Sequence, residues 1–270
     1  MAIQSLFYNS ASEAARVLSA NPQARFYGGG TLVMRAINEG DQTFDTIVRI
    51  NDPVMTQLQS SGNRLVIGAG VTMAAVLQNR DAQFLHAAAR SVGGPAIRNM
   101  ATVGGNLFAQ SPYGDFTTAL LALDGEVVFA DGNQVALAEL LVQRVNSTGR
   151  LGVVTHVSVT RPASADDFRY LKISRVKPKG ISVMTFAAHL PRHGSQLQQV
   201  RLAAGAMGTT PLRMLSAERE LEGRALDGAS IEAAARVVLD GLSPPTDPIA
   251  TSWYRAEVAP VHFKRLLNGS

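Results

Sequence analysis

Short apolar segments alternate with short polar segments along the first 160 residues, and this pattern predicts a succession of short strands and helices. Apolar residues at helical spacing follow a possible capping serine, Ser10, and this first helix is expected to end near Asn21. Further short apolar runs predict strands at 24–27, 46–50, 64–67, 126–130 and 153–159. Helical spacing predicts helices up to residue 38 and at 73–78, 81–91 and 117–123.

The last 110 residues have a different pattern, in which longer strands are followed by helices. Strands are expected at 181–190 and 197–204, and helices at 212–222, 230–239 and 253–267. Pro260 is expected to kink or split the last helix. A polar connector at 161–167 separates the two patterns, so we expect an α+β fold with one domain over 1–165 and a smaller one over 166–270.

Composition narrows the chemistry that this chain can perform by itself. It has no cysteine, which excludes disulfides, thiolate catalysis and cysteine-held iron–sulfur clusters. The 25 basic and 21 acidic residues give a net charge of +4, and no basic run is longer than two residues, so no nucleic-acid or membrane partner is expected. No apolar run approaches the ~20 residues of a membrane span, and the start lacks signal-peptide features, which predicts a cytoplasmic protein.

The first glycine segment (residues 28–31) consists of Gly28, Gly29, Gly30 and Thr31 and lies between a predicted strand and a predicted helix. Glycines permit positive φ angles and let a ligand approach the backbone amides without obstruction by a Cβ. The alternative is a tight turn that binds nothing. Three consecutive glycines lose much conformational entropy on folding, which favours a phosphate site over a bare turn.

The second glycine segment (residues 102–106) is followed at once by further polar residues. Thr102, Asn106 and Ser111 offer neutral donors that suit a diphosphate or a ribityl chain. Asp115 either accepts from sugar or ribityl hydroxyls or caps the next helix, and the sequence leaves both open. Two glycine turns in one domain support dinucleotide binding better than either turn alone.

Tyr170 and Lys172 fall on one face of a predicted strand, because side chains alternate with a period of two. A lysine that faces a flavin would stabilise the reduced anionic ring, and an aromatic residue beside it could cover the ring. The alternative is an ordinary strand with a solvated lysine. The five histidines are scattered and no carboxylate pattern supports them, so no metal site is expected.

Together these segments resemble the FAD-binding (medium) subunit of the molybdenum hydroxylases, the family of xanthine dehydrogenase and carbon monoxide dehydrogenase. The resemblance runs in order through almost the whole chain and is carried by residues 28–31, 97–107, 111–115, 170–175 and 203–213. It implies a vanillyl-alcohol-oxidase-type FAD-binding domain of two subdomains, about 1–56 and 57–165, followed by a smaller α+β domain.

The resemblance also implies which residues hold the cofactor. In the family the two glycine loops hold the pyrophosphate, the residue at Asp115 contacts the hydroxylated chain, and those at Val154 and Lys172 approach the ring. The expected FAD-binding residues are Gly28, Gly29, Gly30, Thr31, Leu32, Val33, Thr102, Gly104, Gly105, Asn106, Ser111, Asp115, Val154, Tyr170 and Lys172. Neither loop contains His or Cys, so the FAD is expected to be bound non-covalently.

The family's reaction is divided among chains, and no catalytic residue is expected in this one. Molybdopterin lies in a large subunit, two [2Fe–2S] clusters lie in a small subunit, and FAD passes the electrons to an external acceptor; a dimer of such heterotrimers is expected. The lack of cysteine agrees with this division, because the clusters must be held elsewhere. The alternative is a self-contained FAD oxidoreductase of the same superfamily, for whose catalytic acid the sequence offers no candidate.

Overall fold

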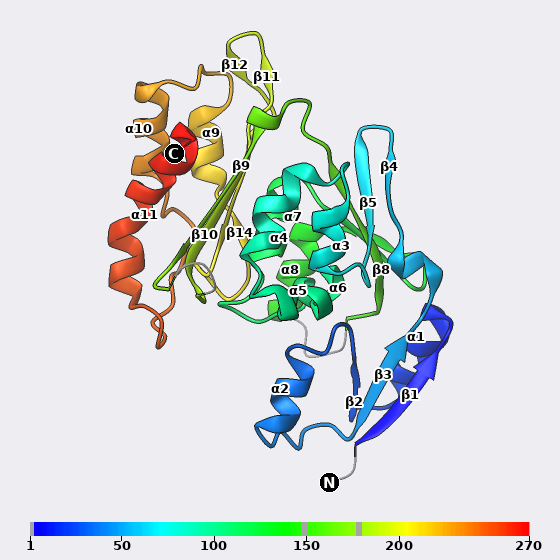
Figure 1. Cartoon of the computed structure of the whole chain (residues 1–270). Coiled ribbons are helices and arrows are strands. Elements are labelled where there is room, and N and C mark those ends of the chain that lie inside the picture. The colour runs from blue at the N-terminus through cyan, green and yellow to red at the C-terminus, as the bar shows by residue number, and fades with distance from the viewer. Residues whose placement is uncertain (1–2, 147–150, 177–179, 270) are drawn as a thin grey trace.

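The N-terminal part of the chain is a small lobe around a three-stranded parallel sheet. The computed structural model describes residues 3–146, 151–176 and 180–269 (Figure 1). The sheet has the order β1-β3-β2 and consists of β1 (Gln4–Tyr8), β3 (Thr46–Ile50) and β2 (Ala24–Phe26). The first helix of the lobe, α1 (Ala11–Ala20), begins after Ser10, whose hydroxyl accepts from the Glu13 amide as the capping pattern predicts. The helix α2 (Val33–Asn38) follows the first glycine segment.

A second lobe is built around a five-stranded antiparallel sheet in the order β4-β5-β8-β6-β7. Its strands are β4 (Leu58–Ser61), β5 (Arg64–Gly68), β6 (Glu126–Phe129), β7 (Gln134–Ala136) and β8 (Val154–Thr160). Its helices are α3 (Met73–Gln78), α4 (His86–Ser91), α5 (Pro95–Met100), α6 (Val103–Leu107), α7 (Asp115–Ala122) and α8 (Leu137–Asn146). Every residue of α7 is buried, so this helix lies at the centre of the molecule.

The C-terminal part is a four-stranded antiparallel sheet in the order β14-β13-β10-β9 with helices on its outer face (Figure 1). Its strands are β9 (Phe168–Ser174), β10 (Ser182–His189), β13 (Arg201–Gly205) and β14 (Leu212–Arg213). The outer helices are α9 (Leu215–Leu221), α10 (Gly228–Arg236) and α11 (Ser252–Asn268). A short hairpin, β11 (Arg192–His193) and β12 (Gln196–Leu197), projects from one end.

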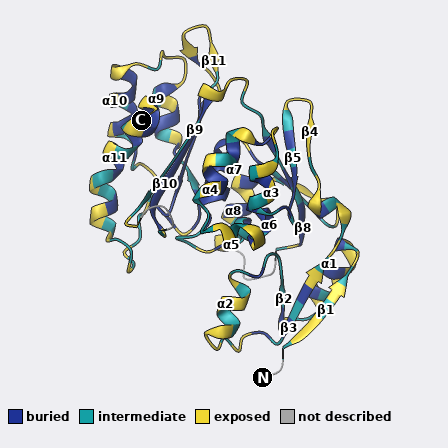
Figure 2. Ribbon diagram, in the orientation of Figure 1, coloured by how far each residue is buried: buried dark blue, intermediate teal, exposed yellow. Residues whose placement is uncertain are grey.

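The C-terminal sheet is covered on both faces, which explains why β10 is buried along its whole length (Figure 2). The helix α11 contacts β9 and β10, whereas α7 of the second lobe contacts β10 and β13. Small side chains face α7, since Ala187 and Ala203 belong to the hydrophobic core of the first two lobes. Larger residues of the same strands, such as Phe186 and Leu202, belong to a second core under the outer helices. The start of α7 therefore lies directly against the C-terminal sheet.

Several predicted elements are present and others differ. The pattern at 81–91 predicted one helix, but the chain forms a 3₁₀ turn (Gln83–Leu85) and the short α4. The glycine-rich region around 93–114 contains α5 and α6, which the pattern did not predict. The helix α11 is not split at Pro260, because buried residues on both sides of the proline hold it against the sheet.

None of the helices within the described ranges is long and apolar enough to span a bilayer.

Candidate functional site

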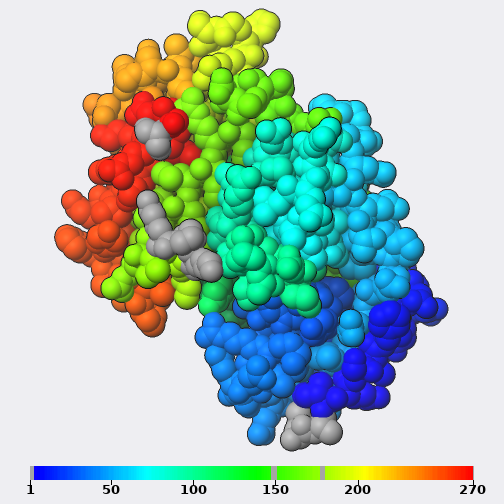
Figure 3. Space-filling view, in the orientation of Figure 1, coloured from blue at the N-terminus to red at the C-terminus, as the bar shows by residue number. Residues whose placement is uncertain are grey.

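A cavity of about 1070 Å³ lies where the three parts of the chain meet, and this volume is at the upper end for small-molecule and cofactor sites. The blue N-terminal lobe and the cyan-to-green second lobe abut in the space-filling view (Figure 3). Most of the residues expected at a binding site line this cavity: Gly28, Gly29, Gly30, Thr31, Leu32, Val33, Thr102, Gly104, Gly105, Asn106, Asp115, Val154 and Lys172. Ser111 and Tyr170 are not among the described residues that line it.

The first glycine segment packs directly against the turn between α5 and α6. A Cβ on Gly29 would lie 1.5 Å from the carbonyl oxygen of Met100, and one on Gly28 would lie 2.9 Å from the hydroxyl of Thr102. Gly30 has a φ of 73°, a conformation that favours glycine. Gly28 and Gly29 therefore let the first glycine segment pack closely against Met100 and Thr102 at the start of the second, while both segments remain on the cavity wall.

The second glycine segment is held by its own side chains. Thr102 is the N-cap of α6, and its hydroxyl oxygen accepts from the amide of Gly105 at 3.1 Å. The side-chain oxygen of Asn106 accepts from the amide and hydroxyl of Thr117 at 2.9 and 3.0 Å. Both side chains are thus fixed through their acceptor atoms, and among the described residues no acceptor is paired with the Thr102 hydroxyl hydrogen or the Asn106 amide hydrogens.

Asp115 is the first residue of α7, and its carboxylate does not cap that helix. Gly114 is the N-cap residue instead, with a φ of 108°. The carboxylate accepts from Ser182 Oγ at 2.5 Å, from Thr185 Oγ1 at 2.6 Å and from Lys172 Nζ at 2.7 Å. All three donors belong to the C-terminal sheet, so Asp115 joins that sheet to the central helix.

Lys172 completes this cluster on the cavity wall. Its ammonium group also donates to the carbonyl oxygen of Ser91 at 2.8 Å, and the side chains of Lys172 and Asp115 are each 11% exposed. An ammonium has three donors and a carboxylate about four acceptor positions. Within the described residues, the contacts named above leave one donor of Lys172 and one acceptor position of Asp115 unused, and both residues line the cavity.

Tyr170 lies on the same side of β9 as Lys172, as the period of two predicted, but its hydroxyl is turned away from the cavity. It contacts Ser91 Oγ at 2.7 Å, and its ring packs against the core of the first two lobes. Burial raises the pKa of the Tyr170 phenol well above 10, and the nearby Asp115 charge adds to this effect. The phenol therefore stays protonated. Its contact with the Ser91 side chain helps to position Ser91, whose carbonyl oxygen accepts from Lys172.

The cavity has more positive than negative charge on its wall. Among the described residues, Asp115 is the only one with a carboxylate side chain that lines the cavity, and its charge is balanced by Lys172. The lining cations are Arg25, Arg35, Arg144 and Lys172. The three arginines were not predicted from the sequence, because single arginines at ordinary spacing do not form a recognisable motif.

Arg144 of α8 stabilises the backbone that follows the second glycine segment. It donates to the carbonyl oxygens of Leu107 and Ala109. Its guanidinium also lies over the ring of Phe108, at 5.8 Å from the centroid. Burial lowers the pKa of Arg144. Its ordinary value is so high that the group remains charged at neutral pH.

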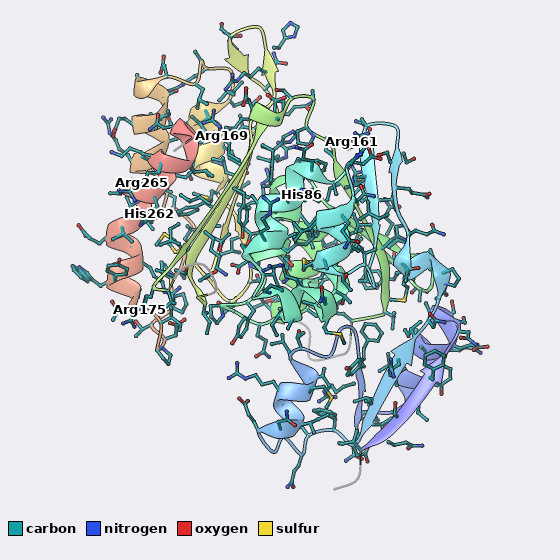
Figure 4. The ribbon with its side chains drawn as sticks, in the orientation of Figure 1. His86, Arg161, Arg169, Arg175, His262 and Arg265 are labelled. Carbon is teal, nitrogen blue, oxygen red and sulfur yellow. The ribbon has the colours of Figure 1, made fainter. Side chains whose placement is uncertain are left out.

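The histidines lie on different elements. Figure 4 shows His86 on α4 and His262 on α11, on opposite sides of β9. Within the described parts of the chain, no three His, Asp or Glu side chains are arranged to hold a metal ion.

Comparisons with known proteins agree with this architecture. Residues 2–160 match the model of the FAD-binding domain in molybdopterin dehydrogenase, and residues 169–269 match that of the carbon monoxide dehydrogenase flavoprotein C-terminal domain. The glyceraldehyde dehydrogenase medium chain of Sulfolobus acidocaldarius is 26% identical over 263 residues, which cover 93% of this chain and 92% of that protein. The nicotinate dehydrogenase FAD-subunit of Eubacterium barkeri is also 26% identical and covers 91% and 87%.

Solved structures show the same fold. A carbon monoxide dehydrogenase chain from Hydrogenophaga pseudoflava superimposes with a TM-score of 0.90 at 22% identity, over 99% of this chain and 96% of that chain. A quinoline 2-oxidoreductase chain from Pseudomonas putida gives a TM-score of 0.84 at 21% identity, over 100% and 96%. The chain therefore has an α+β fold and belongs to the family with the FAD-binding domain of molybdopterin dehydrogenases, followed here by a smaller domain of the carbon monoxide dehydrogenase flavoprotein type.

Proposed function

We propose that this chain binds FAD non-covalently and is the electron-transfer subunit of a multi-subunit molybdenum hydroxylase. In this proposal it takes electrons from [2Fe–2S] clusters of a small partner subunit and passes them to an external acceptor, while a large subunit holds the molybdopterin. The observation that carries the proposal is a single cavity with both glycine segments on its wall, in a chain of this family. The names of relatives as medium chains or FAD-subunits support it.

The residues on the wall fit a dinucleotide diphosphate. The first and second glycine segments expose backbone at the cavity where side chains would not fit, and Thr102 and Asn106 keep hydrogens that can donate. The excess of arginine over carboxylate favours an anionic ligand. We propose that the diphosphate is held by Gly28, Gly29, Gly30, Thr31, Leu32, Val33, Thr102, Gly104, Gly105 and Asn106.

The flavin part of the cofactor is assigned to the wall made by Asp115, Val154 and Lys172. The free donor of Lys172 and the free acceptor of Asp115 suit a ribityl chain or a polar ring edge. When bound, the flavin would supply reversible uptake of electrons. The positive charge of Lys172 would favour a ligand that gains negative charge, and Ser91 and Tyr170 keep that charge in place. Ser111 is proposed to act through the loop that carries it.

The organisation of the chain follows from the same proposal. We propose one FAD-binding domain over 1–165, with subdomains of about 1–56 and 57–165, and a C-terminal domain over 166–270. This division is supported by the two family models, of which the first match ends at residue 160 and the second begins at residue 169. Because the chain has no cysteine, the clusters must be held by a partner. A cytoplasmic dimer of heterotrimers is the proposed assembly.

The proposal is tested by purifying the chain from its native host through an affinity tag, with an absorption spectrum and a gel of the co-purifying proteins. One larger and one smaller partner, together with flavin bands that acid releases into the supernatant, are expected. Anaerobic addition of the complex's substrate should then bleach the flavin in the intact complex but not in the isolated chain. Flavin on a chain without partners would instead favour a self-contained oxidoreductase and overturn the subunit assignment.

A further inference from the structure

Beside the cavity, a side-chain contact joins the parts of the chain that follow the two glycine segments. Arg35 lies in α2, which directly follows the first glycine segment, and Tyr113 lies between α6 and α7, after the second. Nη1 of Arg35 donates to the hydroxyl of Tyr113 at 2.9 Å, although the two residues are 78 positions apart. Both residues also line the cavity. The contact therefore connects the N-terminal lobe to the second lobe at the place where the proposed diphosphate site is formed.

This contact is on the solvent side and can open without unfolding the protein. The Arg35 side chain is 57% exposed, and its Nε donates to Glu39 Oε1 at 2.7 Å within the same helix. The Glu39 contact orients the guanidinium without crossing between lobes. Exposed contacts of this kind contribute little to global stability. Breaking the Tyr113 contact should therefore leave the fold intact and change only the connection between the two lobes.

The guanidinium has capacity to bind a ligand in addition to Tyr113. Arginine carries five N–H donors, of which Glu39 and Tyr113 use two. A guanidinium fork is suited to phosphate oxygens, and Arg35 is on the cavity wall. Resting on the proposed function, we infer that Arg35 and Tyr113 form a bridge that slows the release of the bound dinucleotide, with Arg35 adding a positive charge for its diphosphate.

The bridge is tested by the rate at which the full-length chain, loaded with FAD, releases flavin after dilution, followed by the rise in flavin fluorescence. Tyr113→Phe removes the hydroxyl and keeps the ring, and release should be about three- to tenfold faster, as expected for one lost hydrogen bond. Arg35→Leu should accelerate release further. It should also make the rate less dependent on salt, because it removes a charge as well as the bond.

Matched controls are available away from the cavity. Arg224→Leu breaks an exposed i,i+4 pair with Glu220 that resembles the pair between Arg35 and Glu39. Tyr254→Phe removes the hydroxyl of an exposed tyrosine on α11. Both controls should release FAD at the rate of the unaltered protein, and circular dichroism should show that all four variants are folded.

A double variant separates a bridge from two independent effects. In Arg35→Leu protein, the further change Tyr113→Phe should no longer accelerate release, because its partner is already absent. Release at the unaltered rate in both single variants, or accelerations that multiply in the double variant, would overturn the bridge. Failure of the proposed function looks different, because the unaltered chain would then retain no FAD.

Discussion

The pair formed by Asp115 and Lys172 should stabilise the protein as well as shape the cavity. Replacing Asp115 by Asn keeps the size of the side chain but removes its charge, and it points an amide group or a weaker acceptor at the lysine. Lys172 would then be a nearly buried cation without an anion, since its side chain is only 11% exposed. The hydroxyls of Ser182 and Thr185 would also lose the charged acceptor that they share.

The size of the effect follows from the 2.7 Å separation of the charged atoms. At an effective dielectric constant of about 20, two unit charges at this distance attract by about 6 kcal/mol. Desolvation of the two ions cancels much of this attraction, so the net value of the pair is smaller. Removing one partner of a buried pair typically costs about 3–5 kcal/mol, and Asp115→Asn should lower the free energy of unfolding by that amount.

Urea unfolding of four proteins measures this effect: the unaltered chain, Asp115→Asn, Lys172→Met and the double variant. The double variant should be more stable than the sum of the single losses predicts, by about 2 kcal/mol, because it leaves no unpaired charge. Glu232→Gln is the control, since it breaks an exposed pair with Lys264 of similar length and should cost less than about 1 kcal/mol. Single losses below about 1 kcal/mol that simply add would show that Asp115 and Lys172 are not a stabilising buried pair.

Three further predictions concern other parts of the molecule. Gly29→Ala forces a Cβ into a backbone carbonyl and should abolish FAD binding in a fluorescence titration, whereas Gly228→Ala, where nothing lies within 4 Å, should bind normally. Arg255→Met removes a fully buried guanidinium and leaves its ion-pair partner, Asp247, without a cation, so urea unfolding should show the free energy of unfolding lowered by about 3–5 kcal/mol. A decrease below about 1 kcal/mol would contradict this. Burial lowers the pKa of His189, so the unfolded chain binds a proton first and stability falls as pH drops below about 6.5. His189→Gln should weaken that fall between about pH 7.5 and 5.5, and an equally steep fall would be the contrary result.

The sequence predicted those features of the site that depend on residue type and on spacing within one segment. The three consecutive glycines at 28–30 suit neither a strand nor a helix, and their lack of side chains by itself indicates a close approach to the backbone. The structure adds that part of this approach is to the second glycine segment itself. Tyr170 and Lys172 share a side of β9 because the period of a strand is fixed, but that period could not say that the phenol turns away from the cavity.

What the sequence could not provide depends on contacts between distant segments. The donors to Asp115 come from residues 57 to 70 positions away, so no local spacing could distinguish a helix cap from an inter-domain acceptor. Ser182 and Thr185 looked like ordinary strand residues, and Arg35 and Arg144 like ordinary helix residues. The helices α5 and α6 are only six and five residues long and contain glycine, so their stability comes from packing against neighbours and not from helix propensity.

The proposed function requires that the cavity bind one FAD per chain through the glycine segments, without a covalent bond. Titration of the cofactor-free chain with FAD, followed by flavin fluorescence and by acid precipitation of the complex, tests it most directly. We expect saturation at one FAD per chain, full recovery of the flavin in the acid supernatant, and loss of binding in Gly29→Ala but not in Gly228→Ala. No saturable binding by the folded, unaltered chain would contradict it.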